Sequence, residues 1–230
     1  MSIPNNKSKQ LKELGQILSS SKYNEQNTDR KIRLITFKKH FSDQDDYCQV
    51  TKDVKDSYIV FIPTTDDKHT IYFLHLLFDS SIGRVFLSTL ATNKIGGNVT
   101  LKLLREFPVL DVSDDIIKAG AILDLSIKTI VQIMQEKEDL ELLESVRSLM
   151  QEIRDAFILE LYSKPFFENN NINIVKPLVE IIDGIDSTKL NLVVPKLLKA
   201  IINPNGELLG NIRRLRVLIG NIFDKIKSNK

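Results

Sequence analysis

The spacing of hydrophobic residues changes near residue 111 and divides the chain into two regions. Before this point, short apolar runs alternate with polar loops; after it, apolar residues recur every three or four positions, as on one face of a helix. We therefore predict an α+β fold. Its mixed domain spans 1–110, a long helix or helical hairpin spans 111–162, and a helical C-terminal region spans 163–230.

Four apolar stretches define the predicted N-terminal domain. Residues 11–18 predict a short helix or a strand edge. Residues 31–41 alternate apolar and charged positions, which predicts a half-buried strand, whereas residues 56–63 predict a strand buried on both faces. In residues 71–91 the apolar positions take helical spacing.

Two long apolar stripes define the helical region. Asp111 and Ser113 are candidate N-caps for a helix over 114–134, and a second stripe at heptad spacing predicts a helix over 143–157. The second stripe consists of Leu143, Val146, Met150, Ile153 and Phe157. The polar residues 135–141 between the stripes are either a helix turn or a coiled-coil stutter. Because one helix cannot bury the second stripe alone, it packs on the 114–134 helix or on a second copy of the chain.

Charge and composition limit the function. The net charge is only +2, so no overall basic field indicates nucleic acid, and a single cysteine excludes a disulfide framework. The N-terminus lacks an apolar signal region and no apolar run approaches the ~18 residues of a membrane span, so we expect a cytoplasmic protein with no membrane partner.

The two charge-rich helical segments have opposite signs. Residues 136–160 contain eight acids and three bases, which argues against a DNA-facing helix there. Residues 210–230 contain six Lys or Arg and one Asp. This last segment is either a packed helix with a solvated basic face or a contact to nucleic acid phosphates.

Residues with catalytic chemistry are scattered. His40, His69 and His75 lie in separate segments without a metal-ligand spacing, and Cys48 has no evident base partner. The acidic run 42–46 is better explained as a solvated loop than as nuclease carboxylates. We predict that the chain is not an enzyme and uses no cofactor or metal.

A Gly-Gly pair stands out in the segment NKIGGNVTLKLLREFPV, residues 93–109. A phosphate-binding loop would need a following Gly-Lys-Ser or Gly-Lys-Thr, which this segment lacks. From the residues themselves we expect a tight turn into a short packed helix, because glycine adopts φ > 0 without needing a ligand.

The order of these segments resembles one target-recognition domain and its following helix in the specificity subunits of type I restriction-modification systems. The matching positions are Leu14-Gly15, Tyr72 to Leu77, Ser80, Gly83, Gly96, Leu104 and Pro108. The resemblance covers about residues 11–160. The chain departs from the family in the segment PVLDVSDDII, where a Pro-rich entry to the helix is usual, and in having one recognition domain where two are usual.

The resemblance implies a non-catalytic DNA sequence-recognition module that works with a DNA methyltransferase subunit. Double-stranded DNA, a restriction subunit and a second copy of the chain in a homodimer are the other partners that fit it. Lys and Arg would position the domain on phosphates while Asn, Gln or Arg side chains read base edges in the major groove. The resemblance also implies that the glycine turn lies where the domain packs around DNA, so that the backbone and polar side chains of GGNVTLK approach the duplex. The candidate DNA-binding residues are Lys22, Lys38, Lys39, Arg84, Lys94, Asn98 and Lys102. The near-neutral charge favours an alternative, a helical protein–protein adaptor that does not bind DNA.

Overall fold

The computed structural model describes residues 8–26, 34–38, 48–51, 54, 58–64, 67–95, 99–136, 140–183 and 190–219. The described chain divides into two compact units, one that ends at Val112 and one that begins at Ser113. The first contains strands and helices and the second is helical, so the predicted α+β class is confirmed.

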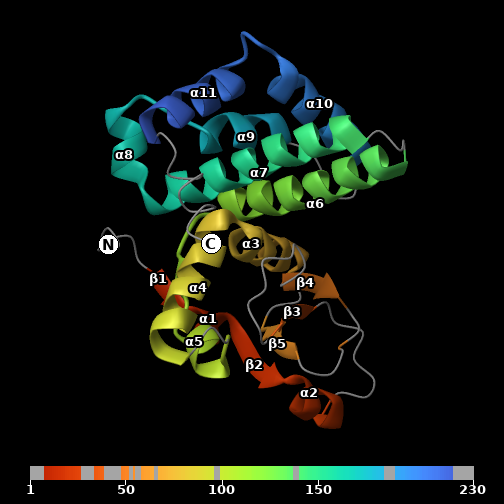
Figure 1. The fold of residues 1–230 in the computed structure, drawn as a ribbon, viewed down its shortest axis with the longest axis vertical. Coiled ribbons are helices and arrows are strands. Elements are labelled where there is room, and N and C mark those ends of the chain that lie inside the picture. The colour runs from red at the N-terminus through yellow and green to blue at the C-terminus, as the bar shows by residue number, and fades with distance from the viewer. Residues whose placement is uncertain are drawn as a thin grey trace. The chain divides into compact units, whose positions relative to one another are not determined.

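The described part of the α+β unit contains a four-stranded and a two-stranded antiparallel sheet. The larger sheet, whose strands are labelled in Figure 1, has the order β2-β5-β3-β4. The smaller one pairs β1 with β6. The elements are β1 (Ser8–Gln10), α1 (Leu11–Leu14), β2 (Gly15–Ser19), α2 (Ser20–Gln26), β3 (Leu34–Lys38), β4 (Cys48–Thr51), β5 (Tyr58–Pro63), α3 (Lys68–Asp79), α4 (Ser81–Ile95), α5 (Leu101–Arg105) and β6 (Pro108–Leu110). Because Ser8 pairs with Leu110, the two ends of the unit lie next to each other.

Different helices cover the two faces of the larger sheet. On one face, Leu34 of β3 and Val60 of β5 pack with Tyr23 of α2. On the other face, the rings of Phe37 in β3 and Phe78 in α3 meet edge to face with centroids 4.9 Å apart. Successive residues of a strand point to opposite faces, so a sheet covered on both sides buries every position of its central strands.

The burial of β3 corrects one prediction and that of β5 confirms another. Four consecutive residues of β3, Leu34 to Phe37, are at most 3% exposed, so the half-buried strand predicted for 31–41 was wrong. The charged residues of that segment all lie outside 34–37, toward its ends. Tertiary packing covers residues 34–37 on both faces of the sheet. Strand β5, at 58–63, is buried on both faces as predicted.

Residues 71–91, which show a single helical spacing, belong to two helices. Helices α3 and α4 are separated by Ser80, and their axes differ by 68°. The segment 11–18, predicted as helix or strand, contains both, since α1 ends at Leu14 and β2 begins at Gly15.

The helical unit is built on a hairpin of two long helices. Helices α6 (Asp114–Glu136) and α7 (Leu140–Tyr162) lie side by side (Figure 1). The remaining described helices are α8 (Lys164–Asn169), α9 (Val175–Ile182), α10 (Leu190–Ile202) and α11 (Glu207–Ile219). Helices α9 and α10 pack on α6, where Ile182 and Val193 meet Ala119 and Ile122. Described residues of the predicted regions 111–162 and 163–230 therefore pack in one cluster.

The C-terminal part of the apolar stripe of the second long helix is buried within the chain, whereas Val146 is half-buried and the side chain of Leu143 lies outside the described residues. Met150, Ile153 and Phe157 are at most 1% exposed, and α7 contacts α6, α8, α9 and α11. Packing on the 114–134 helix was the first of the two arrangements predicted, and the contact of α7 with α6 confirms it.

Only one of the two predicted N-caps adjoins α6. The carbonyl oxygen of Ser113 accepts the N–H groups of Ile116 and Ile117 at 3.0 and 3.1 Å, which starts the helix at Asp114. Asp111 instead pairs with Lys9 at 2.8 Å and ties the end of β6 to β1.

Candidate nucleic-acid interface

The edge strand β2 is bordered by three short helices that carry exposed basic side chains. Helix α1 precedes β2, α2 follows it, and α5 packs on it. Lys12 on α1, Lys22 on α2 and Lys102 on α5 are exposed, and none of them has an ion-pair partner in the described part of the chain. Their ammonium groups are therefore available to an anionic ligand.

Arg105 adds a fourth basic side chain, and together with Lys12, Lys22 and Lys102 it forms what we call the β2 surface. Its exposed side chain lies against β2, where Nη2 donates a hydrogen bond to the Ile17 carbonyl at 3.4 Å. The sequence predictions missed Arg105, although its i,i+3 spacing from Lys102 on an apolar helix was a usable signal. The β2 surface also carries exposed acids, Glu13 on α1 and Glu106 after α5.

Helix α5 has a local explanation in the residues after the Gly-Gly pair. Thr100 is its N-cap, because its Oγ1 accepts the N–H of Leu103 at 3.3 Å. Val99, Leu103 and Leu104 are buried, while Lys102 points outward. Residues 101–105 thus form a short packed helix whose exposed side carries Lys102 and Arg105.

Several predicted contacts lie at the edge of what the structure describes. Lys38 ends β3 and is half-buried. Lys94 belongs to α4, but its side chain, like the whole of Lys39 and of residues 96–98 with Asn98, lies outside the described residues. The base-reading role of Asn98 and the DNA-facing Gly-Gly turn stay predictions.

Arg84 stands at the junction of α3 and α4 and is already paired. Its Nη2 lies 2.5 Å from Oδ1 of Asp79, and its Nε donates to the Asp79 carbonyl at 3.3 Å. Ser80, between the helices, donates its hydroxyl to the Leu77 carbonyl at 2.7 Å and accepts the N–H of Gly83 at 3.0 Å. Arg84 therefore helps to hold the bend between the helices.

Two glycines that match the specificity-subunit pattern are required by close packing. A Cβ atom on Gly83 would lie 2.2 Å from the Leu77 carbonyl oxygen. A Cβ atom on Gly15 would lie 2.2 Å from the Ile62 carbonyl oxygen and 2.6 Å from the Phe61 ring. Both positions therefore exclude any side chain, because the neighbouring backbone occupies the space.

The basic side chains of α11 make contacts inside the helical unit. Each of its three arginines has a partner: Arg213 donates to the Pro204 carbonyl, Arg214 donates to the Asn171 carbonyl, and Arg216 pairs with Glu152. These contacts favour the packed-helix interpretation for residues 210–219 of the basic segment, whereas its residues 220–230 lie outside the described residues.

A half-buried carboxylate caps α9. Oε2 of Glu160 accepts the N–H groups of Ile174 and Val175 at 2.6 and 2.9 Å. Burial raises the pKa of the Glu160 carboxyl above its ordinary 4.5, against these two hydrogen bonds, which lower it. The buried amide of Asn211 holds the same loop by donating to the Asn173 carbonyl at 2.7 Å.

The described histidines and cysteine have structural environments. Within the described ranges, no three His, Cys, Asp or Glu side chains are grouped to hold a metal ion. Nε2 of His75 lies 3.3 Å from the Cys48 carbonyl oxygen, and both residues are buried.

His69 lies beside Asp67, which caps α3 by accepting the N–H groups of His69 and Thr70. Burial acts to raise the pKa of Asp67, but these hydrogen bonds outweigh it and lower that pKa below 3.8. His40 and the acidic run 42–46 lie outside the described residues.

No single helix among the described residues is long and apolar enough to cross a membrane. The bent pair of α3 with the first part of α4 reaches that length and composition only when the two helices are taken together.

Comparison with known proteins adds no relative. No family model, curated protein or solved structure matches the chain.

Proposed function

We propose that the chain is a non-catalytic DNA sequence-recognition module that acts with a DNA methyltransferase subunit. The observation that supports it is the β2 surface, where α1, α2 and α5 of one α+β unit carry exposed basic side chains, three of them lysines without an ion-pair partner among the described residues. A basic surface of this kind binds the phosphate backbone, which gives the larger part of the affinity.

The arrangement of the unit is consistent with a module attached to a helical support. Its first and last strands pair with each other, so the chain enters and leaves the unit at one place. The helical unit follows directly at Ser113. This is the order of elements in the family that the sequence resembles. The methyltransferase, the restriction subunit and the second copy remain parts of the proposal.

The predicted contact residues take different roles in this proposal. Lys22 and Lys102 would contact phosphates and fix the register of the unit on DNA. Asn98 would read a base edge, which would favour the correct base over a wrong one by about 1–3 kcal/mol. Arg84 would act indirectly, by holding the bend between α3 and α4 through Asp79.

A salt titration tests the proposal. Fluorescence anisotropy of a labelled random-sequence duplex would be measured with the full chain and with the Lys22→Ala, Lys102→Ala double variant. If both residues contact phosphates, the slope of log K against log salt should fall by about two, because each contact contributes about 0.9.

The matched control is Lys196→Ala, Lys199→Ala, which removes the same charge from α10 of the helical unit, where both side chains are exposed. This variant should keep the wild-type slope. Absence of duplex binding at low salt, or equal slopes for all three proteins, would reject the β2 surface as a DNA contact.

One observation favours the adaptor as a second candidate function. The largest exposed hydrophobic side chains of the described residues all lie in the helical unit: Ile133, Phe166, Leu192, Val217 and Leu218. Apolar exposure favours a protein partner, and such binding would not weaken log-linearly with salt. Failure of duplex binding in the titration above would leave the adaptor as the better proposal.

A further inference from the structure

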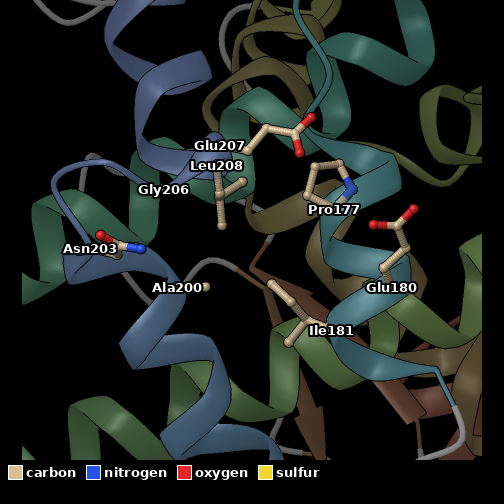
Figure 2. Close-up of a pocket in the computed structure, with 8 residues that line it drawn as sticks. All are labelled: Pro177, Glu180, Ile181, Ala200, Asn203, Gly206, Glu207 and Leu208. Carbon is tan, nitrogen blue, oxygen red and sulfur yellow. The ribbon is translucent and has the colours of Figure 1, made fainter.

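A shallow hollow of about 360 Å³ lies where α9, α10 and the start of α11 meet. Figure 2 shows its lining, with Ile181 and Pro177 from α9 and Leu208 from α11 as apolar side chains. Two acidic residues, Glu180 of α9 and Glu207 of α11, also line it. The hollow thus joins an apolar floor to two carboxylates, all within the helical unit.

The end of α10 adds a third source of negative potential. Ala200, Asn203 and Gly206 line the hollow. The carbonyl oxygens of Ala200 and Asn203 lie 3.2 and 3.1 Å from where a Cβ of Gly206 would stand, and that of Asn203 accepts the N–H of Gly206 at 3.0 Å. The usual i+4 donor to the Ala200 carbonyl would be residue 204, which is a proline and has no N–H. Carbonyl groups at a helix C-terminus carry partial negative charge and attract cations.

The two carboxylates at the hollow are not held in strong ion pairs with described residues of the chain. Lys176 lies 3.9 Å from Glu180, but both side chains are more than 60% exposed, and a pair of that kind contributes little. Glu207 has no ion-pair partner in the described part of the chain. Arg213, the nearest base along α11, donates to the Pro204 carbonyl and does not line the hollow.

We propose that this hollow binds a lysine or arginine side chain of a partner protein. The aliphatic stem of such a side chain covers apolar surface while its charged head stays at the polar rim. Here the stem lies on Pro177, Ile181 and Leu208, and the head lies at the rim beside Glu180 and Glu207. The charge complementarity excludes an anionic occupant, and the apolar floor disfavours a bare metal ion. The inference does not depend on DNA binding.

Short peptides test the hollow directly. The probe is acetyl-Leu-Arg-Leu-amide, titrated into the ¹⁵N-labelled full chain and followed by amide chemical shifts. The neutral isostere acetyl-Leu-citrulline-Leu-amide keeps the shape of the probe and removes its charge. We expect saturating shifts at Ile181, Ala200, Gly206 and Leu208 with the arginine peptide, and binding weakened about fivefold with the citrulline peptide.

A charge-neutralising variant with a matched control completes the test. Glu180→Gln with Glu207→Gln keeps the size of both side chains and should weaken the arginine peptide about fivefold or more. Glu168→Gln removes one charge from the equivalent exposed i,i+4 pair with Lys164 on α8, and should leave binding unchanged. The amide spectrum of each variant verifies its fold.

Three results would overturn the proposal. They are equal affinity for the arginine and citrulline peptides, unchanged affinity in the glutamine double variant, and shifts spread over the acidic surface of α7 instead of gathered at the hollow. An absence of shifts at millimolar peptide would overturn it as well.

Discussion

Gly83→Ala should destabilise the α+β unit, because the bend between α3 and α4 has no room for a methyl group. The new Cβ would lie 2.2 Å from the Leu77 carbonyl oxygen, well inside van der Waals contact. That oxygen is backbone and is held by the hydroxyl of Ser80 at 2.7 Å, so it cannot turn aside as a side chain would. The start of α4 must therefore move by about 1 Å, as overpacked sites do.

The expected cost combines three effects. Overpacking costs about 1–3 kcal/mol. Movement of α4 also stretches the cap from Gly83 N–H to the Ser80 hydroxyl, and loss of a cap costs about 0.5–2 kcal/mol. The higher helix propensity of alanine returns about 1 kcal/mol. We expect a net loss of about 2 kcal/mol in the free energy of unfolding.

Urea unfolding followed by circular dichroism would measure this loss, with the slope of each transition compared between proteins. Hydrogen exchange of α3 and α4 amides would show whether the loss falls in the α+β unit. The matched control is Gly210→Ala in α11, where an added Cβ meets no atom within 4 Å. This control should gain about 0.5–1 kcal/mol, because glycine in a helix interior is unfavourable relative to alanine.

The reasoning is refuted if Gly83→Ala unfolds at the same urea concentration as the wild type, or if the two alanine variants shift in the same direction. Either result would mean that α3 and α4 are not held as closely as the Ser80 bridge and the position of Gly83 require.

Variants at three further sites test the caps and the helical core. Met150→Asp should lower the free energy of unfolding by about 3 kcal/mol or more, since the site is 1% exposed. An unchanged thermal midpoint would show that the face of α7 that carries Met150 is not buried. Asp67→Ala should cost about 0.5–2 kcal/mol at pH 7, and Asp67→Asn less. Because the folded-state pKa of Asp67 is lowered, its contribution is present above pH 3.8 and is lost as pH falls further, so wild type and Asp67→Ala should converge in acid unfolding. The folded-state pKa of Glu160 is raised, so its contribution is fully present below pH 4.5 and is lost as pH rises through the folded-state value. The free energy of unfolding of Glu160→Gln, relative to that of wild type, should therefore be higher at pH 7 than at pH 4. Urea unfolding at both pH values measures this difference, and the opposite order would reject a raised pKa for Glu160.

The local sequence pattern was sufficient to predict those elements whose apolar residues follow a regular spacing or form an unbroken run. The stripe ending in Met150, Ile153 and Phe157 predicted both a helix and its burial, because the periodicity of a helix places such residues on one face. Strand β5 was predicted with both faces buried, because an unbroken apolar run carries no polar face. The α+β class followed from the change of spacing near residue 111.

The β2 surface required the tertiary structure. Lys12, Lys22 and Lys102 are far apart in the sequence, and only the packing of α1, α2 and α5 around β2 brings their helices to one strand. The sequence also did not show which charged residues form ion pairs. Nothing in it distinguished Arg84, which is bound to Asp79, from an exposed basic residue.

Gly83 and Thr36 illustrate the division between sequence and structure. The sequence by itself determined that a glycine follows the apolar run of 71–78, but only the fold placed the Leu77 carbonyl where a side chain would stand. The alternating pattern at 31–41 indicated a solvent-facing side for β3, yet Thr36 is 3% exposed and its hydroxyl donates to the Gln49 carbonyl at 3.4 Å. Periodicity records the polarity of a residue, whereas burial depends on which distant elements cover it; the sequence therefore determined the elements, and the tertiary structure determined their neighbours.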